Sequence, residues 1–362
     1  MKDRISRIFK NLKESCDCIL IKNGSIPYID YTFYYVTGLE KGVFEGAYVV
    51  LYPDGGSDLI IPELESEIAC DTSLSVNTYR SRDECERIIK RLLSSYRRVG
   101  LNNSALIISD YNKLREWFPD LLFVDISKEI MDVRLTKDRE EIERIHQACV
   151  IADKTMKRIP EIVTENIREY ELASEIDYLL MKYGADKPAF ETISSFGVNT
   201  SKPHYSHDDN ILKKGDFIVC DFGACYKRYN SDITRTFIYR VASKKQREMY
   251  EVVREAQQRG LDSIKAGVPC RTIHDIVLSY INDTPFKDRF IHSTGHSLGL
   301  SVHDGPGFSS DSKIILKENM VLTVEPGVYI PGYGGVRIED DILVKKDGYE
   351  LLTNSTKDLY EL

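Results

Sequence analysis

Acidic residues interrupt two apolar stretches in the second half of the chain, at a spacing that would let them meet. Asp221 lies within the apolar stretch 219–223, and Asp232 precedes a second such stretch, eleven residues further along. Adjacent strands joined by a hairpin bring opposing Cβ atoms to within about 5 Å. Two buried carboxylates that close repel each other unless a cation neutralises them. We interpret the pair as metal ligands; the alternative is that Asp221 caps a turn and Asp232 forms an ion pair with Arg235.

Three of the seven histidines, His292, His296 and His303, lie within twelve residues of one another. Glycines separate them, and glycine lets the backbone approach a neighbour or a ligand closely. Histidine supplies general acid–base groups near neutral pH and is the commonest metal ligand. A lone histidine in an apolar segment is usually a packed core residue, but a cluster of three indicates a functional site.

Two further carboxylates occupy positions where an unpaired charge is costly. Glu325 directly follows the apolar stretch 320–324. Glu339 comes two residues after Arg337, so both side chains can face the same side of one strand. In the absence of a metal, an Arg337–Glu339 or Arg337–Asp340 ion pair would explain this segment.

These residues include a ligand set of four carboxylates and one imidazole: Asp221, Asp232, His296, Glu325 and Glu339. Oxygen-rich ligation of this kind suits Mn²⁺, Co²⁺ or Fe²⁺ and is less typical of structural Zn²⁺. Bridging carboxylates can hold two such ions about 3.5 Å apart, an arrangement that activates water for hydrolysis. The sequence therefore predicts a hydrolase with two divalent ions. Mn²⁺ or Co²⁺ is the first expectation, and Zn²⁺ or Fe²⁺ are the alternatives.

The segments around these ligands resemble the methionine aminopeptidase and prolidase superfamily of metallopeptidases, whose catalytic domain has the pita-bread fold. The matching motifs are Asp221-Phe222-Gly223, Ser231-Asp232-Ile233-Thr234-Arg235-Thr236, His292-x-x-Gly295-His296-x-Leu298-Gly299, Val302-His303, Glu325-Pro326-Gly327 and Gly335-Val336-Arg337-Ile338-Glu339-Asp340. The order and spacing of the ligands are similar to those of the compact prolidases. The resemblance covers residues 136–350, and the part before them fits a creatinase-like N-terminal domain more loosely.

The resemblance implies a role for each ligand. Asp221 would bind one ion, His296 and Glu325 would bind the other, and Asp232 and Glu339 would bridge the two. The ions would activate water for attack on the scissile carbonyl and stabilise the developing oxyanion. Glu325 would also act as the proton shuttle.

Four more residues match site positions of the proline-specific branch of this superfamily. His303 matches the histidine that hydrogen-bonds the substrate carbonyl or the tetrahedral intermediate. His204 matches the histidine near the leaving imino nitrogen, and His292 matches another site histidine. Arg337 is expected to orient either Glu339 or the carboxylate of the substrate.

The resemblance implies hydrolysis of the Xaa-Pro bond of dipeptides, as in a prolidase. A prolidase needs a basic group that recognises the free C-terminal carboxylate. The alternative, an aminopeptidase P, removes the first residue from longer Xaa-Pro peptides. A non-catalytic pita-bread protein that binds a peptide or a partner is a further alternative, although all five ligands are present. Two departures from the family pattern, Ser297 where Gly is common and Asp304 where Glu is frequent, remove no ligand.

The composition is that of an ordinary globular protein, with 42% hydrophobic and 29% charged residues and a formal net charge of −8. An acidic chain without a Lys/Arg-rich run lacks the basic footprint of a nucleic-acid-binding protein. No apolar stretch approaches the roughly 18 residues of a transmembrane helix, so we expect no membrane or export segment. Eight scattered cysteines without zinc or redox spacing favour reduced thiols in a cytoplasmic protein.

The pattern of elements that must position the site favours two domains. We expect a smaller α/β domain over residues 1–130 and an α+β catalytic domain, of the pita-bread type by resemblance, over residues 136–362. Because the family is commonly dimeric, a homodimer is expected as well.

Several element boundaries follow from local signals. Tyr31–Tyr35 is rich in β-formers and is expected to be a strand. Thr136 is the expected N-cap of a helix that reaches about Ile159, where Pro160 intervenes. Further on, strands are expected over 320–329 and 335–344.

Overall fold

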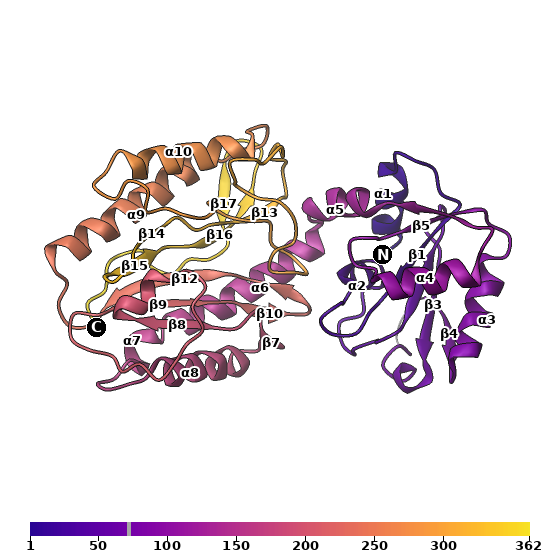
Figure 1. The fold of residues 1–362 in the computed structure, drawn as a ribbon, viewed down its shortest axis with the longest axis horizontal. Helices are drawn as coiled ribbons and strands as arrows, with labels where there is room; N and C mark the ends of the chain where they lie inside the picture. Colours follow the sequence, from indigo (N-terminus) through magenta and orange to yellow (C-terminus); the bar gives the residue numbers. More distant parts are fainter. Residues whose placement is uncertain (71–73) are drawn as a thin grey trace. The chain divides into compact units, whose positions relative to one another are not determined.

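The computed structural model describes residues 1–70 and 74–362, which divide into two compact units, residues 1–134 and residues 135–362. Each unit is described by itself (Figure 1). In the described part of the chain, no helix combines the length and the apolar character needed to cross a membrane. All eight cysteines are free thiols, as expected.

Unit 1 is built around a six-stranded sheet with the strand order β4-β3-β2-β1-β5-β6. Its elements are α1 (Lys2–Asn11), β1 (Cys18–Lys22), α2 (Tyr31–Thr37), β2 (Tyr48–Leu51), β3 (Ser57–Pro62), η1 (Glu63–Glu65), β4 (Ser75–Tyr79), α3 (Arg82–Leu93), β5 (Arg98–Leu101), α4 (Ile108–Trp117), β6 (Leu122–Asp125) and α5 (Ser127–Leu135). Strand β1 pairs antiparallel with β2 and parallel with β5. Ile89 of α3 and Leu114 of α4 share a buried cluster with Leu20 of β1, which is the packing expected of an α/β domain.

The expectation of a strand at Tyr31–Tyr35 is wrong, because these residues form most of helix α2. The carboxylate of Asp30 accepts a hydrogen bond from the backbone N–H of Thr32 at 2.8 Å and caps the start of the helix. Gly38 ends it in the left-handed conformation, with φ of 72°. These two caps, together with burial of nearly the whole helix, outweigh the strand propensity of its aromatic residues.

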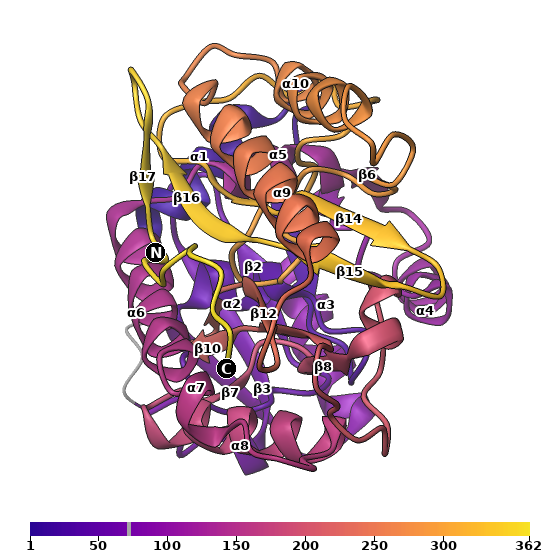
Figure 2. The same ribbon diagram turned by 90° about the vertical axis from the view of Figure 1, so that its left-hand side faces the viewer.

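Unit 2 has helices on both sides of its strands. Its helices are α6 (Arg139–Met156), α7 (Ile159–Ile162), α8 (Glu169–Lys182), α9 (Lys244–Asp262) and α10 (Cys270–Asn282). Its other elements are β7 (Lys187–Pro188), β8 (Ile193–Phe196), η2 (Gly197–Ser201), β9 (Phe217–Phe222), β10 (Ala224–Tyr226), β11 (Tyr229–Asn230), β12 (Ile233–Ile238), β13 (Val321–Val324), β14 (Gly327–Ile330), β15 (Gly334–Arg337), β16 (Asp340–Val344) and β17 (Tyr349–Leu351). Helices α9 and α10 cover one side of the strands and α6–α8 cover the other (Figures 1 and 2).

Helix α6 begins two residues later than the expected N-cap. Asp138, not Thr136, caps it, because the Asp138 carboxylate accepts from the backbone N–H of Glu141 at 2.9 Å and the Glu141 carboxylate accepts from the N–H of Asp138 at 3.0 Å. Thr136 instead forms an isolated β-bridge with Met320. The helix ends at Met156, and Pro160 lies inside the short helix α7.

Each of the two apolar stretches near the C-terminus is broken into two strands. Glu325-Pro326 separates β13 from β14, and Ile338-Glu339 separates β15 from β16. Strands β13 and β16 pair antiparallel, with Val324 opposite Asp340. The two breaks therefore lie side by side, and each presents a carboxylate at the same end of the β13–β16 pair.

Candidate active site

Strands β9 and β12 bring Asp221 and Asp232 to one face of their sheet. Thr234 lies directly opposite Asp221 in the antiparallel register, and Asp232 precedes Thr234 by two residues, so all three side chains point the same way. Arg235 points to the other face, where its guanidinium donates to Asp340 at 2.6 Å. The alternative of an Asp232–Arg235 ion pair is therefore wrong.

His296 is held at the site by pairing with the end of β13. Its backbone N–H donates to the Thr323 hydroxyl at 3.1 Å, and its carbonyl accepts from the Thr323 N–H at 2.9 Å. Glu325 comes two residues after Thr323, and its N–H donates to the carbonyl of Thr294 at 2.8 Å. As a result, His296 Nε2 lies 3.5 Å from Glu325 Oε1 and 3.6 Å from Asp232 Oδ2.

Glu339 reaches the same point from the break between β15 and β16. Its backbone N–H donates to the carbonyl of Thr234 at 3.1 Å, and its Oε2 accepts from the Thr234 hydroxyl at 2.6 Å. Ligand atoms of Asp232, His296 and Glu339 all lie within 4.8 Å of one another. Residues more than a hundred positions apart in the chain thus converge on a space the size of a metal coordination shell.

Burial makes the carboxyl groups of this cluster poor anions in the absence of a cation. The pKa of Asp232 is raised well above its ordinary value, first by burial and then by the neighbouring Asp221, Asp341 and Glu325. Burial, followed by Asp232, Glu325 and Asp221, likewise raises the pKa of Glu339. The pKa of Glu325 is also raised, mainly by burial.

The donor set fits divalent metal ions. Asp221 Oδ1, Asp232 Oδ1 and Glu339 Oε1 are buried and have no hydrogen-bond partner. Buried polar atoms are almost always satisfied in native proteins, and a bound metal ion would satisfy these oxygens. Carboxylate oxygens and an imidazole nitrogen are ligands that Mn²⁺, Fe²⁺ and Co²⁺ accept.

Arg337 contacts a different partner from those expected. Its guanidinium is ion-paired with Asp221, and Nη1 donates to the Tyr329 hydroxyl at 2.9 Å. Nε donates to the Thr234 hydroxyl at 3.1 Å, and Thr234 in turn donates to Glu339. The expected influence of Arg337 on Glu339 therefore passes through Thr234, and no direct hydrogen bond joins the two in the described contacts.

His292 extends this chain of hydrogen bonds. Its Nε2 lies 2.9 Å from the Tyr329 hydroxyl, and its Nδ1 lies 2.8 Å from the carbonyl of Ser293. Burial first, and then the charge of Arg337, lowers the pKa of His292 to about 3. A neutral ring fits both contacts, with Nδ1–H donating to Ser293 and Nε2 accepting from Tyr329.

The other two site histidines lie where solvent reaches the cavity. The ring of His303 packs edge-on against that of His296, with centroids 4.2 Å apart, and both His303 and His204 are exposed. Burial of the ring, followed by the nearby His296 and His204, lowers the pKa of His303.

One cavity of about 300 Å³ contacts all nine residues singled out in the sequence. Its lining consists of Phe190, Ile193, Pro203, His204, Asp221, Asp232, His292, Ser293, His296, Val302, His303, Glu325, Arg337 and Glu339. Of the apolar members, Val302 belongs to the motif Val302-His303, whereas Phe190 and Ile193 were not anticipated, because single apolar residues carry no chemical signal in a sequence.

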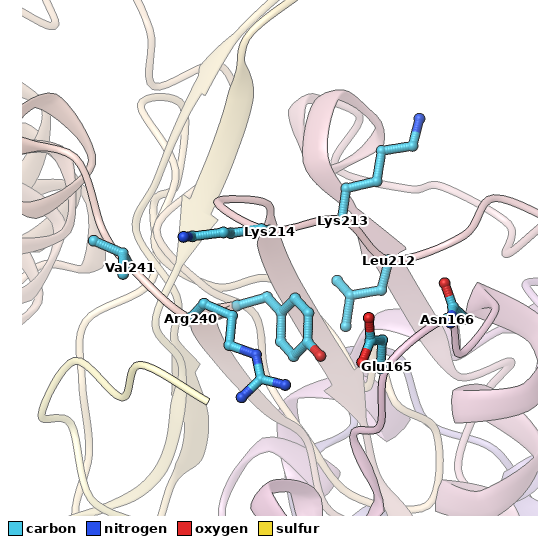
Figure 3. A pocket seen from close by; sticks show the side chains of 8 residues that line it. Glu165, Asn166, Leu212, Lys213, Lys214, Arg240 and Val241 are labelled. Atoms are coloured by element: carbon cyan, nitrogen blue, oxygen red, sulfur yellow. The ribbon is translucent and has the colours of Figure 1, made fainter.

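A second pocket, of about 570 Å³, lies elsewhere on unit 2 (Figure 3). It is lined by Glu165, Asn166, Leu212, Lys213, Lys214, Tyr239, Arg240 and Val241. It contains one carboxylate and no histidine, and the amino groups of its lysines point away from Glu165 (Figure 3). These residues offer no set of metal ligands.

Three polar residues support the site although the sequence assigned them no role in it. Thr234 joins Arg337 to Glu339, and Tyr329 joins Arg337 to His292. Asp341 accepts from the backbone N–H of Asp232 at 2.8 Å. Thr234 lies within the motif Ser231-Asp232-Ile233-Thr234-Arg235-Thr236 and Asp341 directly follows the motif that ends at Asp340, which is the one signal that could have drawn attention to them.

Comparison with known proteins gives a consistent result. The family described as "Metallopeptidase family M24" matches residues 143–346, and "Creatinase/Prolidase N-terminal domain" matches residues 4–136. The chain is 38% identical to the Xaa-Pro dipeptidase of Pyrococcus furiosus, over 99% of this chain and 100% of the relative. Its structure is similar to the Xaa-Pro dipeptidase from Bacillus anthracis, with a TM-score of 0.92 and 32% identity over 99% of both chains. It is also similar to X-Pro aminopeptidase from Thermotoga maritima, with a TM-score of 0.92 and 29% identity over 99% of this chain and 100% of the other.

Proposed function

The chain belongs to metallopeptidase family M24 and carries the creatinase/prolidase N-terminal domain, and we propose that it hydrolyses the Xaa-Pro bond of dipeptides. The observation that supports this most directly is the set of buried, unpartnered oxygens of Asp221, Asp232 and Glu339 around one cavity. The full-length similarity to Xaa-Pro dipeptidases supports the same substrate class.

Two divalent ions fit this proposal, with Mn²⁺ or Co²⁺ as the first candidates. Asp221, Asp232, His296, Glu325 and Glu339 would hold them. Bound ions supply Lewis-acid stabilisation of the developing oxyanion and a water activated for attack. Glu325, whose side chain is 15% exposed and faces both His296 and His292, is positioned to take up and release a proton.

The remaining residues would bind and orient the substrate. His303 and His204 stand at the accessible part of the cavity and would hydrogen-bond the scissile carbonyl and the imino nitrogen side, respectively. Arg337, by its ion pair with Asp221 and its bond to Thr234, would fix the two carboxylates on either side of it. Apolar contact with Phe190 and Ile193 would exclude water from the reacting bond.

One observation favours a second candidate, removal of the first residue from longer Xaa-Pro peptides. Arg337 is the one Lys or Arg among the described residues that line the cavity, and its guanidinium is engaged by Asp221, Tyr329 and Thr234. Among the described residues of the cavity lining, a dipeptide carboxylate would therefore find no unengaged lysine or arginine, whereas an extended peptide has no carboxylate at that position.

The test is hydrolysis of Ala-Pro and Met-Pro against Ala-Pro-Gly, by protein stripped of metal and then refilled with Mn²⁺, Co²⁺ or Zn²⁺. Metal-dependent cleavage of the dipeptides alone establishes the dipeptidase. Cleavage of Ala-Pro-Gly at a comparable rate moves the assignment to the aminopeptidase. His296→Ala is expected to be inactive, while His146→Ala, a histidine outside the cavity, serves as the matched control. No cleavage of any of these peptides with metal bound would refute both activities.

We further propose that the protein is a cytoplasmic homodimer. The eight free thiols support a reducing compartment. Sedimentation equilibrium measures the assembly directly, and a mass of one chain of 41.5 kDa would refute the dimer.

A further inference from the structure

Residues 196–210 carry His204 and Pro203 to the cavity with little regular structure of their own. The segment contains the last residue of β8 and the short 3₁₀ helix η2, and residues 202–210 form no helix or strand. Loops of this kind depend on side-chain anchors for a fixed position, because they lack a ladder of backbone hydrogen bonds.

One buried carboxylate accepts hydrogen bonds from several residues of that segment. Glu169, the first residue of α8, is fully buried, and both of its oxygens accept hydrogen bonds from the segment. The donors to Oε1 are the Phe196 N–H at 2.7 Å, Asn199 Nδ2 at 3.0 Å and Asn210 Nδ2 at 3.2 Å; those to Oε2 are the Tyr205 hydroxyl at 3.0 Å and the Asp208 N–H at 3.2 Å. Five donors spread over fifteen residues thus converge on a single side chain.

The anchored positions flank His204 closely. Tyr205 is the next residue in the chain, and its hydroxyl also accepts from Asn199 Nδ2 at 2.9 Å. Pro203, on the other side, accepts a bond from Arg337 Nη1 at 3.4 Å. His204 is exposed and makes no protein hydrogen bond among the described contacts, so its location is set by its neighbours in the chain.

We propose that Glu169 is a positioning residue. It holds residues 196–210 against the start of helix α8 and thereby places His204 in the active-site cavity. Glu169 itself does not line the cavity and acts only through this segment. The inference rests on the proposed function for its kinetic consequence, but its structural consequence can be measured without any substrate.

Glu169→Gln is the central variant, because the amide keeps the size of the side chain and can accept at one oxygen only. The amide nitrogen then takes the place of Oε2. The backbone N–H of Asp208 therefore faces an NH₂ group and loses its acceptor. The Glu171→Gln variant is the matched control. Glu171 lies on the same helix turn, and its carboxylate accepts from Arg168 and makes no bond to the segment in the described contacts.

Amide hydrogen exchange measures directly whether Glu169 holds residues 196–210 in place. In folded, metal-loaded Glu169→Gln, exchange of the amide of Asp208 should accelerate about tenfold or more, since a lost hydrogen bond to a charged acceptor is worth at least about that factor. The ring-proton resonance of His204, assigned by its absence in His204→Ala, should shift in Glu169→Gln and stay in place in Glu171→Gln. Unchanged exchange and an unmoved resonance would overturn the proposal, whether or not the protein cleaves Xaa-Pro peptides.

A double-mutant cycle tests the route of the effect. Glu169→Gln should lower kcat/KM about tenfold at unchanged metal content, but by less than about threefold when His204 is already alanine, because coupled residues are not additive. An equal loss in both backgrounds would show that Glu169 does not act through His204. If Glu169→Gln fails to fold, Tyr205→Phe removes one of the five donors and should show the same shifts at smaller size; no shift in that variant would also overturn the proposal.

Discussion

Replacing one buried ligand carboxylate should stabilise the metal-free protein while abolishing its response to metal. Glu339→Gln is the chosen change, because the amide oxygen can still accept from the Thr234 hydroxyl that now donates to Glu339 at 2.6 Å. Ligand atoms of Asp232 and Glu339 lie within 4.8 Å of each other. With an effective dielectric constant of about 20, two charges at that distance repel by about 3 kcal/mol. Protonation of one carboxyl relieves part of this repulsion, so we expect a gain of about 1–3 kcal/mol.

The sign of the pH dependence follows from the raised pKa values of Asp232 and Glu339. An acid whose pKa is higher in the folded state stabilises the fold below its unfolded pKa, near 4, and that contribution is lost as pH rises toward the folded pKa. The metal-free wild-type protein should therefore lose stability as pH rises above about 4. Glu339→Gln should flatten that slope and widen its advantage toward neutral pH.

Thermal unfolding in EDTA and in Mn²⁺, at several pH values, measures both effects. A gain of about 1–3 kcal/mol corresponds to a Tm higher by roughly 3–10 °C for a unit of this size. Added Mn²⁺ should raise the Tm of the wild-type protein but leave that of Glu339→Gln unchanged. Glu318→Gln, an exposed residue outside the cavity, is the control. A Glu339→Gln variant that is less stable than wild type in EDTA and still responds to Mn²⁺ would refute the charge argument.

Three other substitutions probe the residues behind the ligands. Arg337→Lys should lower kcat/KM at least about tenfold, because an ammonium cannot reproduce the fixed fork of a guanidinium; an unchanged value in a steady-state assay would contradict this. Asp341→Ala leaves the Asp232 N–H without its acceptor and should weaken metal binding about 10–100-fold, as loss of groups that orient ligands typically does, which calorimetric titration with Mn²⁺ measures. Arg235→Met removes one of the two cations paired with the buried Asp340 carboxylate, the other being Lys357, and should cost about 3 kcal/mol in urea unfolding; a smaller loss than for an exposed arginine would contradict it.

The residues proposed as ligands could be singled out in the sequence because each stands in an unusual chemical context. A carboxylate at the end of an apolar stretch, as at Glu325, is costly to bury without a partner of opposite charge. This need can be recognised from the sequence alone. What the sequence did not reveal is the interruption of the strands at these residues. An apolar run predicts a strand, but whether it continues through Glu325-Pro326 depends on pairing with β16, which is a tertiary contact.

The sequence also did not show which buried charged residues form ion pairs with each other. Arg235 and Arg337 both lie near several acidic residues in the chain, and the expected pairs were among near neighbours. The fold instead pairs Arg235 with Asp340 across 105 positions and Arg337 with Asp221 across 116. Successive side chains of a strand point to opposite faces, so Arg235 points away from the site and Arg337 points into it. The strand register therefore decides which arginine contacts the acidic residues of the site.

Charge balance ties the two arginines to the number of ions that the site can hold. On the site side, five acidic residues face the single arginine Arg337: Asp221, Asp232, Glu339 and Asp341, which are buried, and Glu325, which is partly buried. The excess when all are ionised is four negative charges, five minus one. Arg235 does not reduce this excess, because its guanidinium is ion-paired with Asp340 on the opposite face of the strands. One divalent ion would leave two buried charges unbalanced, whereas two ions balance all four, and burial makes an unbalanced charge expensive. Because Arg235 pairs with Asp340 and not with these acidic residues, the charge balance supports the proposed pair of divalent ions.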